Sequence, residues 1–465
     1  MFRGVIQQVH FVGIGGSGMS GIAEVLINLG FKVTGSDLNT GTAVERLRNL
    51  GAKITIGHHP DNIAESDVLV KSTAIPNHNV EIQAAIEQRI PIIPRAEMLA
   101  ELMRMKYGIA VAGTHGKTTT TSMLGAILFK AGIDPTIVIG GKLDALGSSA
   151  RLGEGEFLVA EADESDGSFL CLSPTVGIIT NIDPEHLEHW GTEDNLIDGF
   201  VSFANKVPFF GFAVLCLDHP TVQQIVPRIH RRLITYGFGA QATLRADHIR
   251  QNGIETTFRM HRKDQYLGDI QLHMPGQHNI QNALAAAAVC LELGVSFEQI
   301  QAALHGFTGV DRRFSVRAQG KLSPSDEQDI IVIDDYGHHP VEIQATLQGA
   351  SNAWPERRIV AIFQPHRYTR VRDLFDDFCR AFYSAHTVVV CPVYRAGEKP
   401  IEGIDNHALA RQMRAFGHSN IQLCDDIETL PELISSFWQP GDLVMTLGAG
   451  NVNQCCPLLA KFLHD

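Results

Sequence analysis

The sequence predicts an α/β protein with three domains, each built on a sheet of mainly parallel strands. Short apolar runs alternate with helix-like segments along the whole chain, which is typical of parallel sheets covered by helices. The length of 465 residues also favours about three domains. In the first two, a glycine-rich loop follows an early strand, at the end of the sheet where ligands bind in such folds. We therefore expect domains over residues 1–106, 107–313 and 314–465.

The composition excludes several classes of protein. Hydrophobic residues make up 44% of the chain and charged residues 19%, as in ordinary globular proteins. A net charge of −13, from 51 acidic and 38 basic residues, argues against a general nucleic-acid-binding protein, which would carry a basic domain or stripe. The chain opens without the layout of a signal peptide and holds no apolar run long enough to span a membrane. We therefore expect a cytoplasmic protein without a nucleic-acid partner and without membrane insertion.

The cysteines predict neither a disulfide framework nor a zinc site. Eight cysteines are scattered through the chain, and no Cys-x-x-Cys spacing occurs. Such a distribution is typical of buried free thiols in a reducing compartment.

The first domain opens with a strand and a glycine-rich turn. The apolar run Val9–Val12 leads into Gly13-x-Gly15-x-x-Gly18, and a helix is expected over 19–30. The next expected strand, Lys32–Asp37, ends in an acid nineteen residues after Gly18. This pattern is typical of a loop that approaches a pyrophosphate, with the acid placed for a ribose hydroxyl. It leaves three readings open: a nicotinamide dinucleotide, another nucleotide diphosphate group, or a merely structural turn.

The second domain opens with a stronger phosphate-binding motif. The run Ile109–Ala112 is followed by Gly113-Thr114-His115-Gly116-Lys117-Thr118 and then by residues that favour a helix. Backbone N–H groups of such a turn can surround phosphate oxygens, while Lys117 neutralises charge and Thr118 can bind Mg²⁺. The first glycine of the full motif is replaced by Val111, so the loop is a shortened form. We predict a nucleoside triphosphate site, with an ordinary strand–turn–helix junction as the alternative.

Two polar clusters follow later strands of this domain. The acidic run Glu161–Asp166 comes after the expected strand Phe157–Ala160, and Thr180–His186 comes after Val176–Thr180. Carboxylates at the carboxyl ends of parallel strands can hold Mg²⁺ beside a nucleotide, and a neutral His186 could bind a second metal. The alternatives are a solvated acidic loop and a structural or exposed histidine.

Two further sites are weaker when taken alone. Asn279 and Asn282 are three residues apart at the start of an expected helix, where two amides could read a purine edge, although either could simply cap the helix. Arg313, in Asp311–Phe314 near the second boundary, could bridge to a γ-phosphate or be a solvated linker residue.

The third domain carries histidine-rich loops after two of its strands. Its expected strands are Ile330–Ile333, Ile359–Phe363, Thr387–Val390 and Leu443–Leu447. Asp334-Asp335-Tyr336-Gly337-His338-His339-Pro340 follows the first strand, and Phe363-Gln364-Pro365-His366-Arg367-Tyr368-Thr369-Arg370 follows the second. Both loops carry groups able to hold a carboxylate or an amine, so we predict a substrate face, with chance surface loops as the alternative.

Taken together and in order, these segments resemble the Mur ligases, the ATP-dependent amide-forming enzymes of peptidoglycan synthesis. The strings that carry the resemblance are Gly113–Thr118, Glu161–Asp166, Asp334–Pro340 and Phe363–Arg370. The last two favour the member that adds L-alanine to UDP-N-acetylmuramate over a near relative that reattaches a recycled tripeptide. The resemblance implies a Rossmann-like N-terminal domain for UDP, a central ATPase-type domain, and a Rossmann-like C-terminal domain that closes over both.

The resemblance also implies a set of ligand contacts. Residues expected at the UDP-sugar are Gly15, Gly16, Ser17, Gly18, Asp37, Ser72, Thr73, Ala74 and Ile75. Residues expected at ATP are Gly113, Thr114, His115, Gly116, Lys117, Thr118, Thr119, Asn279, Asn282, Arg313 and Asp335. Residues expected at Mg²⁺ or Mn²⁺ are Thr118, Glu161 and His186. Residues expected at the alanine and muramyl end are Tyr336, His338, His366, Arg367 and Arg370.

The implied reaction proceeds through an acyl phosphate formed from the lactyl carboxylate, which the amine of L-alanine then attacks. The expected catalytic residues are Lys117, His186, Arg313, His338 and His366, with His338 or His366 taking the proton of the amine. We expect a monomer or weak homodimer. The competing functions are the tripeptide ligase, an NAD-dependent oxidoreductase and a non-catalytic nucleotide-binding regulator.

Overall fold

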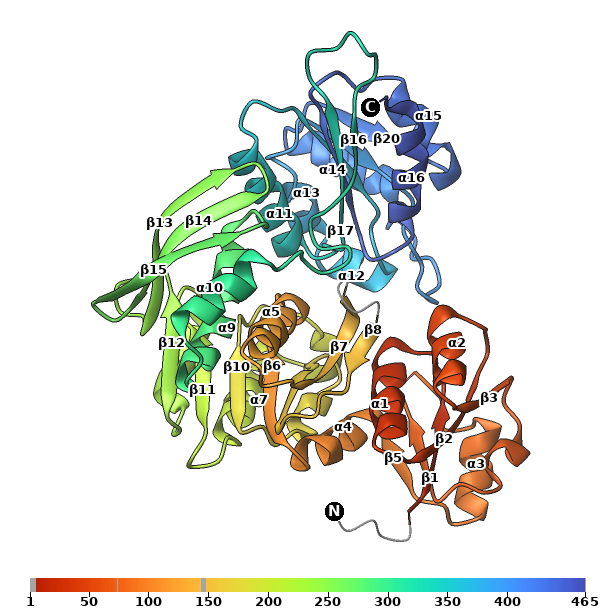
Figure 1. Cartoon of the computed structure of the whole chain (residues 1–465). Coiled ribbons are helices and arrows are strands. Elements are labelled where there is room, and N and C mark those ends of the chain that lie inside the picture. Colours follow the sequence, from red (N-terminus) through yellow and green to blue (C-terminus); the bar gives the residue numbers. More distant parts are fainter. Residues whose placement is uncertain (1–5, 73, 144–147, 465) are drawn as a thin grey trace. The chain divides into compact units, whose positions relative to one another are not determined.

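The strands of the protein form three separate sheets that follow one another along the chain (Figure 1). The computed structural model describes residues 6–72, 74–143 and 148–464. Three sheets in chain order agree with the predicted three-domain α/β architecture. Packing divides the chain into two compact units: one holds the first sheet and most of the second, and the other holds the third sheet together with residues 249–257 and 271–279. The domain boundaries at residues 106 and 313 stay a prediction.

The first sheet is entirely parallel, with the strand order β3-β2-β1-β4-β5. Its elements in chain order are β1 (Gln8–Val12), α1 (Ser17–Asn28), β2 (Lys32–Asp37), α2 (Thr42–Asn49), β3 (Lys53–Ile56), β4 (Val68–Lys71), α3 (Val80–Glu87), β5 (Ile92–Pro94) and α4 (Arg95–Arg104). Helix α1 begins two residues before the expected start and ends before Gly30, which takes the left-handed φ of 86°. Because the strand order reverses between β1 and β4, the loops after these two strands face one crevice.

The second sheet has ten strands in the order β15-β14-β13-β12-β11-β10-β6-β9-β7-β8. Its strands in chain order are β6 (Tyr107–Ala112), β7 (Thr136–Leu143), β8 (Ser148–Arg151), β9 (Phe157–Glu161), β10 (Val176–Ile179), β11 (Phe212–Cys216), β12 (Leu233–Gly237), β13 (Leu244–Asn252), β14 (Glu255–Arg262) and β15 (Gln265–Leu272). Its helices are α5 (Lys117–Lys130), α6 (Leu187–Trp190), α7 (Glu193–Asn205), α8 (Pro220–Ile225), α9 (Gln277–Glu292) and α10 (Phe297–His305). Strand β6 lies between β9 and β10 and is parallel to both, so the three predicted polar loops emerge side by side.

The third sheet has the order β16-β17-β21-β18-β19-β20, and only the edge strand β16 is antiparallel to its neighbour. Its strands are β16 (Ser315–Gly320), β17 (Ile330–Asp335), β18 (Ile359–Phe363), β19 (Thr387–Val390), β20 (Ile421–Leu423) and β21 (Leu443–Leu447). Its helices are α11 (Pro340–Ala353), α12 (Tyr368–Asp373), α13 (Phe375–Arg380), α14 (Asn406–Ala415), α15 (Leu430–Ser435) and α16 (Cys456–Leu459).

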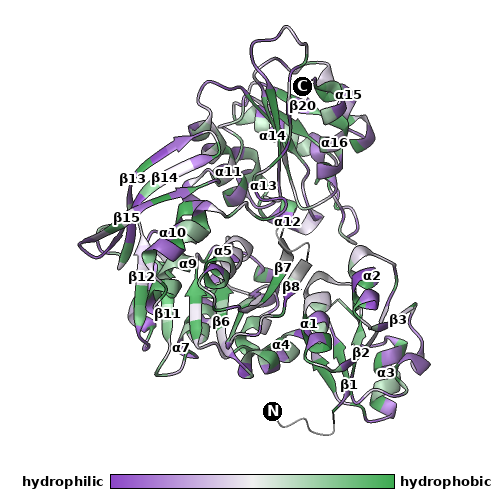
Figure 2. Cartoon of the chain, viewed as in Figure 1, coloured by the Kyte–Doolittle hydropathy of each residue, from purple (hydrophilic) through white to green (hydrophobic). Residues whose placement is uncertain are grey.

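Both faces of the third sheet are buried, as its continuous apolar strands predict. In β18, Ile359, Ala361 and Phe363 pack into one hydrophobic cluster, whereas Val360 and Ile362 pack into another. This alternation follows from the two-residue period of a strand. Figure 2 shows the hydrophobic colour on many of the strands and the hydrophilic colour mainly on loops and parts of helices.

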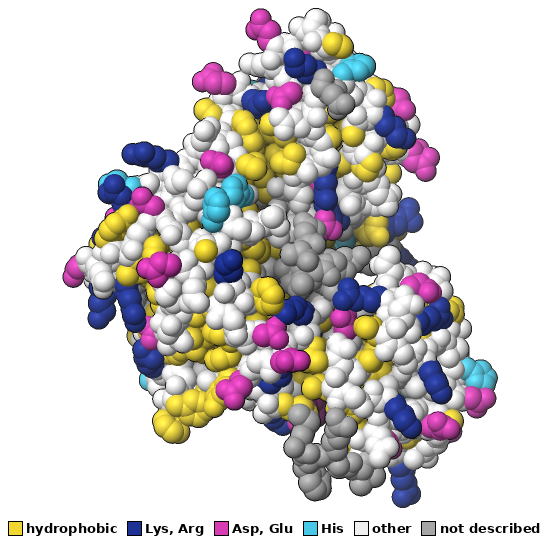
Figure 3. All heavy atoms as spheres, in the orientation of Figure 1, with side chains coloured by type: hydrophobic (Ala, Val, Ile, Leu, Met, Phe, Trp, Pro, Cys, Tyr) yellow, Lys and Arg dark blue, Asp and Glu magenta, His cyan; other side chains and the backbone are white. Residues whose placement is uncertain are grey.

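Seven of the eight cysteines are buried and free, as predicted, and Cys171 is exposed. Four of the buried thiols, Cys391, Cys424, Cys455 and Cys456, belong to one cluster on a single face of the third sheet. Within the described ranges, no helix is long and apolar enough to cross a membrane. The face drawn in Figure 3 mixes basic and acidic side chains.

Candidate functional site

The glycine-rich loop of the first sheet lies at the point where the strand order reverses. Gly13 follows β1, and the Ser72–Ile75 turn follows β4, which is the parallel neighbour of β1. A Cβ on Gly13 would lie 3.2 Å from Ile75 Cδ1, so the two loops lie close together, and their shared role at a UDP-sugar stays a prediction. Helix α1 begins after Gly16 without a side-chain cap, which leaves its first N–H groups available to an anion. Thr73 and the side chain of Ser17 lie outside the described part of the chain.

Asp37 has a structural contact that the sequence did not predict. Its Oδ2 accepts a hydrogen bond of 2.8 Å from the Gly15 N–H, and its Oδ1 accepts one of 3.2 Å from Asn39 N–H. The carboxylate therefore fixes the shape of the glycine-rich loop. Its contact with a ribose stays a prediction.

The phosphate loop of the second sheet has a conformation that only glycine fits. Gly113 has a φ of 129°, and a Cβ there would lie 2.0 Å from Thr180 Oγ1. Gly116 has a φ of 81° and precedes α5, which has no side-chain cap. The first turn of α5 therefore presents N–H groups and a favourable helix dipole to an anion.

Asn181 fixes the part of this loop that is formed by Thr114 and His115. Its main-chain oxygen accepts a hydrogen bond of 3.3 Å from Thr114 N–H, and its Oδ1 accepts one of 2.7 Å from His115 N–H. Asn181 thus engages both N–H groups within the protein, and the ATP contacts predicted for Thr114 and His115 stay predictions. We call Gly116 and the uncapped first turn of α5, which includes Thr118 and Thr119, the cradle.

The amine of Lys117 is enclosed by oxygen atoms. It donates hydrogen bonds to Glu164 Oε2 at 2.8 Å and Oε1 at 3.0 Å, and to the carbonyls of Gly113 at 2.6 Å and Thr114 at 3.1 Å. Burial opposes the charge of Lys117, but nearby carboxylates, with Glu164 the strongest, outweigh it and raise the lysine pKa. Burial also raises the pKa of Glu164, which Lys117 opposes. The short contacts to both carboxylate oxygens favour the ionised pair.

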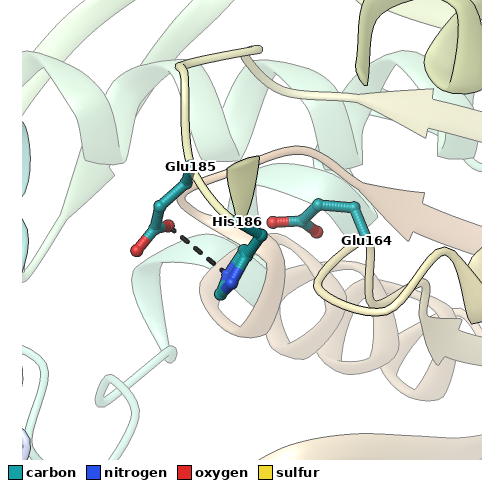
Figure 4. A group of neighbouring side chains, drawn as sticks. All are labelled: Glu164, Glu185 and His186. Atoms are coloured by element: carbon teal, nitrogen blue, oxygen red, sulfur yellow. Dashed lines mark ion pairs between the residues drawn. The ribbon is translucent and has the colours of Figure 1, made fainter. Parts of the chain in front are cut away.

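A histidine and two carboxylates come together beside this lysine. One potential ligand atom from each of Glu164, Glu185 and His186 lies within 4.8 Å of the others (Figure 4). His186 has the left-handed φ of 57°, and its Nε2 lies 3.8 Å from Glu185 Oε2. Carboxylate oxygens with one imidazole suit Mg²⁺ or Mn²⁺. His186 was predicted as a metal ligand, whereas Glu164 and Glu185 were not, although both lie in the polar runs Glu161–Asp166 and Thr180–His186.

The two other predicted metal residues lie at the same edge of the sheet. Glu161 ends β9, directly beside Val111 of β6, and it contributes to the charge around Lys117. Thr118 is the second residue of α5. The ligand roles of Thr118, Glu161 and His186 stay predictions.

His115 belongs to a further cluster that sequence reasoning missed. Its Nε2 lies 3.5 Å from Asp183 Oδ2, and the other carboxylate oxygen of Asp183 lies 3.3 Å from His219 Nε2. The Asp183 N–H donates to Thr114 Oγ1 at 2.9 Å. Asp183 thereby couples the phosphate loop to the loops after β10 and β11. The signal that could have identified this cluster is that His115, Asp183 and His219 each lie in a loop that follows a parallel strand.

The two asparagines predicted at adenine are both buried and already contact protein atoms. Asn282 Oδ1 accepts a hydrogen bond of 3.1 Å from Thr120 Oγ1 and lies against Gly116. Asn279 Nδ2 donates to the Pro275 carbonyl at 2.7 Å. Asn282 therefore reaches the phosphate loop, and the adenine contacts of both residues stay predictions.

At the start of the third domain, two arginines lie over one aromatic ring. The guanidinium carbons of Arg312 and Arg313 are 5.2 and 5.3 Å from the Tyr336 ring centre. Arg312 also bonds Asp334 Oδ2 at 3.1 Å and the carbonyls of Gly448 and Gly450, so it joins the start of this domain to the loop after β21. Arg313, the residue predicted at the γ-phosphate, lies 3.4 Å from Glu342 Oε1.

Asp335 is buried and serves as a structural acceptor. It accepts hydrogen bonds of 2.8 Å from the N–H groups of Phe314 and Gly337. Burial raises its pKa, although Arg313 opposes the rise. Its expected place at ATP stays a prediction.

The two predicted histidines of the third domain come together. The rings of His338 and His366 are 5.9 Å apart, and His366 is stacked on Tyr394 with centroids 5.4 Å apart. Burial, together with Arg370 and Arg367, lowers the pKa of His366 to about 4. The imidazole is therefore neutral at neutral pH and able to accept a proton. The sequence analysis missed Tyr394, which follows β19.

The comparisons with known proteins agree along the whole chain. Family models match residues 8–107 (Mur ligase family, catalytic domain), 111–290 (Mur ligase middle domain) and 312–450 (Mur ligase, glutamate ligase domain). The UDP-N-acetylmuramate–L-alanine ligase of Trichlorobacter lovleyi is 54% identical over 461 residues, covering 99% of this chain and all of the relative. That of Geobacter sulfurreducens is 54% identical and covers 97% of this chain and 96% of the relative.

Solved structures agree with the fold. The crystal structure of UDP-N-acetylmuramate-alanine ligase from Thermotoga maritima superposes with a TM-score of 0.81 at 29% identity, covering 98% of each chain. A murein peptide ligase from Psychrobacter arcticus gives a TM-score of 0.69 at 24% identity, again over 98% of each chain, and shows the shared fold.

Proposed function

This chain belongs to the Mur ligase family, and on that premise we propose that it joins L-alanine to the lactyl carboxylate of UDP-N-acetylmuramate. ATP would be converted to ADP and phosphate, and the product would be UDP-N-acetylmuramoyl-L-alanine, a peptidoglycan precursor. The observation that carries the proposal is the 54% identity, over 99% of the chain, to a relative named for this reaction.

The first sheet would bind the UDP-sugar. Its diphosphate would lie on the uncapped N-terminus of α1, next to the Ser72–Ile75 turn. The crevice at the reversal of strand order is where such ligands bind in parallel sheets. Binding there would direct the lactyl carboxylate toward ATP.

The second sheet would bind ATP and support phosphoryl transfer to the lactyl carboxylate. The first turn of α5 and Lys117 would hold the phosphates, and Arg313 would neutralise charge on the γ-phosphate. Glu164, Glu185 and His186 lie close enough together to hold a divalent cation, and Thr118 and Glu161 would add further oxygen donors. When bound, Mg²⁺ or Mn²⁺ would withdraw charge from the phosphoryl oxygens. The transfer makes the carboxylate an acyl phosphate with a good leaving group.

The third domain would supply the acceptor amine. L-Alanine must attack as the neutral amine, so a neutral imidazole within reach has to take a proton. His366 and the adjacent His338 are the two imidazoles of these loops that could take it, and because burial lowers the pKa of His366 to about 4, His338 is the stronger candidate. Tyr336, Arg367 and Arg370 would hold the carboxylates of the amino acid and the muramyl group. Water must be excluded, because an acyl phosphate hydrolyses in open solvent.

We place the reaction in the bacterial cytoplasm, where its nucleotide substrates occur, and expect a monomer or weak homodimer. Phe209 and Phe210 are 94% and 61% exposed on the loop before β11. An exposed aromatic pair suits a weak contact between two copies. Sedimentation over a range of protein concentrations would test this.

The test of the function is phosphate release with ATP, Mg²⁺ and UDP-N-acetylmuramate, measured with and without L-alanine. Release that needs both acceptor and donor, with the alanyl product seen by mass spectrometry, is the expected result. Release only with the tripeptide L-Ala-γ-D-Glu-meso-diaminopimelate would instead assign the recycling reaction. ATP turnover independent of the UDP-sugar would contradict both.

A further inference from the structure

The proposed nucleotide site already contains an internal ion pair. The ammonium of Lys117 contacts both oxygens of Glu164, at 2.8 and 3.0 Å, and two carbonyls of its own loop. The exposed fractions of the two side chains are 17% for Lys117 and 2% for Glu164. An ammonium offers three N–H donors, and these four acceptors occupy all of them. Lys117 therefore points at Glu164 and its own loop.

The two partners differ in their freedom to move. The main-chain oxygen of Glu164 accepts hydrogen bonds from Gly167 N–H at 3.1 Å and from Trp190 Nε1 at 3.0 Å. Trp190 packs edge-on against buried Phe169, with ring centres 6.1 Å apart. Glu164 is thus anchored at its backbone, whereas Lys117 carries its charge on a flexible four-carbon stem. When the pair breaks, Lys117 is the partner that moves.

We propose that Glu164 is an internal substitute for the nucleotide phosphate, which holds Lys117 until nucleotide displaces it. The inference rests on the proposed nucleotide site. Phosphate oxygens compete with Glu164 for one cation, because both are anionic acceptors within reach of the same amine. Nucleotide binding therefore includes breaking the Lys117–Glu164 pair, and measured affinity is weaker than the cradle alone would give.

The neighbours of Glu164 show what this exchange requires. In Figure 4 its carboxylate points toward His186, with Glu185 on the far side of the imidazole. Once Lys117 has turned to a phosphate, the buried carboxylate of Glu164 faces Glu185 without its former cation. A divalent cation bound by Glu164, Glu185 and His186 would compensate the negative charge of the two carboxylates. The competition between Glu164 and nucleotide is therefore strongest when no divalent cation is present.

The direct test is ADP binding by isothermal titration calorimetry in the presence of EDTA. Glu164→Gln keeps the shape of the side chain and removes its charge, so we expect this variant to bind ADP at least about fivefold more tightly than the wild type. The matched control is Asp166→Asn, in the same acidic run, whose carboxylate accepts from Ser168 N–H and does not contact Lys117. Its affinity for ADP is expected to stay within about twofold.

A second measurement tests the pair in the empty protein. Lys117→Met leaves the carboxylate of Glu164 buried without its partner, so its melting temperature is expected to fall below that of the double variant Lys117→Met/Glu164→Gln. Equal melting temperatures for these two variants would overturn the inference. So would a Glu164→Gln affinity for ADP equal to or weaker than wild type.

The two proposals fail in different ways. Wild-type protein that binds neither ADP nor ATP, with or without Mg²⁺, would overturn the proposed function and this inference together. Wild-type binding without any gain in Glu164→Gln would overturn this inference alone.

Discussion

Two glycine-rich loops of this protein each lead into a helix with an uncapped N-terminus, but the charged side chains beside them have opposite signs. Each follows a central parallel strand and leads into a helix whose N-cap, Gly16 or Gly116, lacks a side-chain cap. In the first loop a carboxylate, Asp37, binds the loop N–H at Gly15. In the second loop a cation, Lys117, comes from the helix itself and is balanced by Glu164.

The conformations of the two loops differ as well. Each loop begins with a glycine of positive φ, Gly13 at 78° and Gly113 at 129°, but only the second loop adds a left-handed N-cap, because Gly116 has a φ of 81° and Gly16 one of −60°. The second loop thus holds two left-handed glycines against one, which is expected where a phosphoryl group must be positioned for transfer and not merely held. The comparison teaches that the backbone supplies the anion site, and that the charged side chains decide what the site can do.

The largest expected effect is that of Gly113→Ala. The added Cβ would lie 2.0 Å from Thr180 Oγ1 at a φ of 129°, so the loop must distort. We expect ATP-dependent activity to fall by about 10³-fold or more, because small displacements at a transfer site are costly. Steady-state kinetics would measure this. Gly41→Ala, with open space around its Cβ, is the control, and equal activity in the two variants would contradict the comparison.

The next effect concerns the cation site. His186→Ala removes the only imidazole of the Glu164–Glu185–His186 group, so we expect activity to fall about 10- to 100-fold and the Mg²⁺ requirement to rise. Mg²⁺ titration of phosphate release would show both changes, and EDTA should abolish turnover. Full activity of the variant at ordinary Mg²⁺ levels would remove His186 from the cation site.

A smaller effect should distinguish the functions of the two loops. Arg95, the first residue of α4, lies so close to the first loop that a Cβ on Gly18 would be 2.5 Å from its Nη1. Its guanidinium lies 3.7 Å from Asp163 Oδ2, and we expect it to turn to a diphosphate bound at the first loop. Arg95→Ala should therefore raise the KM for the UDP-sugar about tenfold and leave the KM for ATP nearly unchanged. Arg104→Ala, exposed on the same helix and paired with Glu101, is the matched control. A change in the KM for ATP that is larger than the change in the KM for the UDP-sugar would contradict the assignment of the UDP-sugar to the first loop and ATP to the second.

The smallest effect concerns a residue outside both loops, His278, the second residue of α9. Burial, followed by the charge of Arg313, lowers the pKa of His278 from 6.5 to about 4. The native state thus holds His278 neutral while the unfolded chain takes up a proton below about pH 6.5, so its stabilising contribution is complete above that pH and is lost toward pH 4. We expect His278→Gln to lose about 2 kcal/mol less stability than wild type between pH 7 and pH 5.

Urea unfolding at both pH values would measure this difference. Identical pH dependence in wild type and variant would mean that His278 titrates normally in the native protein.

The sequence predicted the strands and the loops after them well, because parallel strands that are buried on both faces read as continuous apolar runs. Adjacency of the polar loops followed from strand order, which is how Gly113, Glu161 and His186 could be placed at one edge. Long-range pairings could not be predicted in this way. That Asp37 would bind Gly15, that Asn181 would take two N–H groups of the phosphate loop, and that Glu164 would hold Lys117 depends on side-chain directions fixed only by packing.

The cysteines of this chain can report how often parts of its structure open locally. Cys171 is exposed, whereas four thiols are enclosed on one face of the third sheet. A thiol reagent should therefore label Cys171 at once and reach the other four only when that face separates from the helices over it. Labelling rates, followed residue by residue with mass spectrometry, would report how often this part of the C-terminal domain opens locally. They would also show whether bound ligands make the opening less frequent.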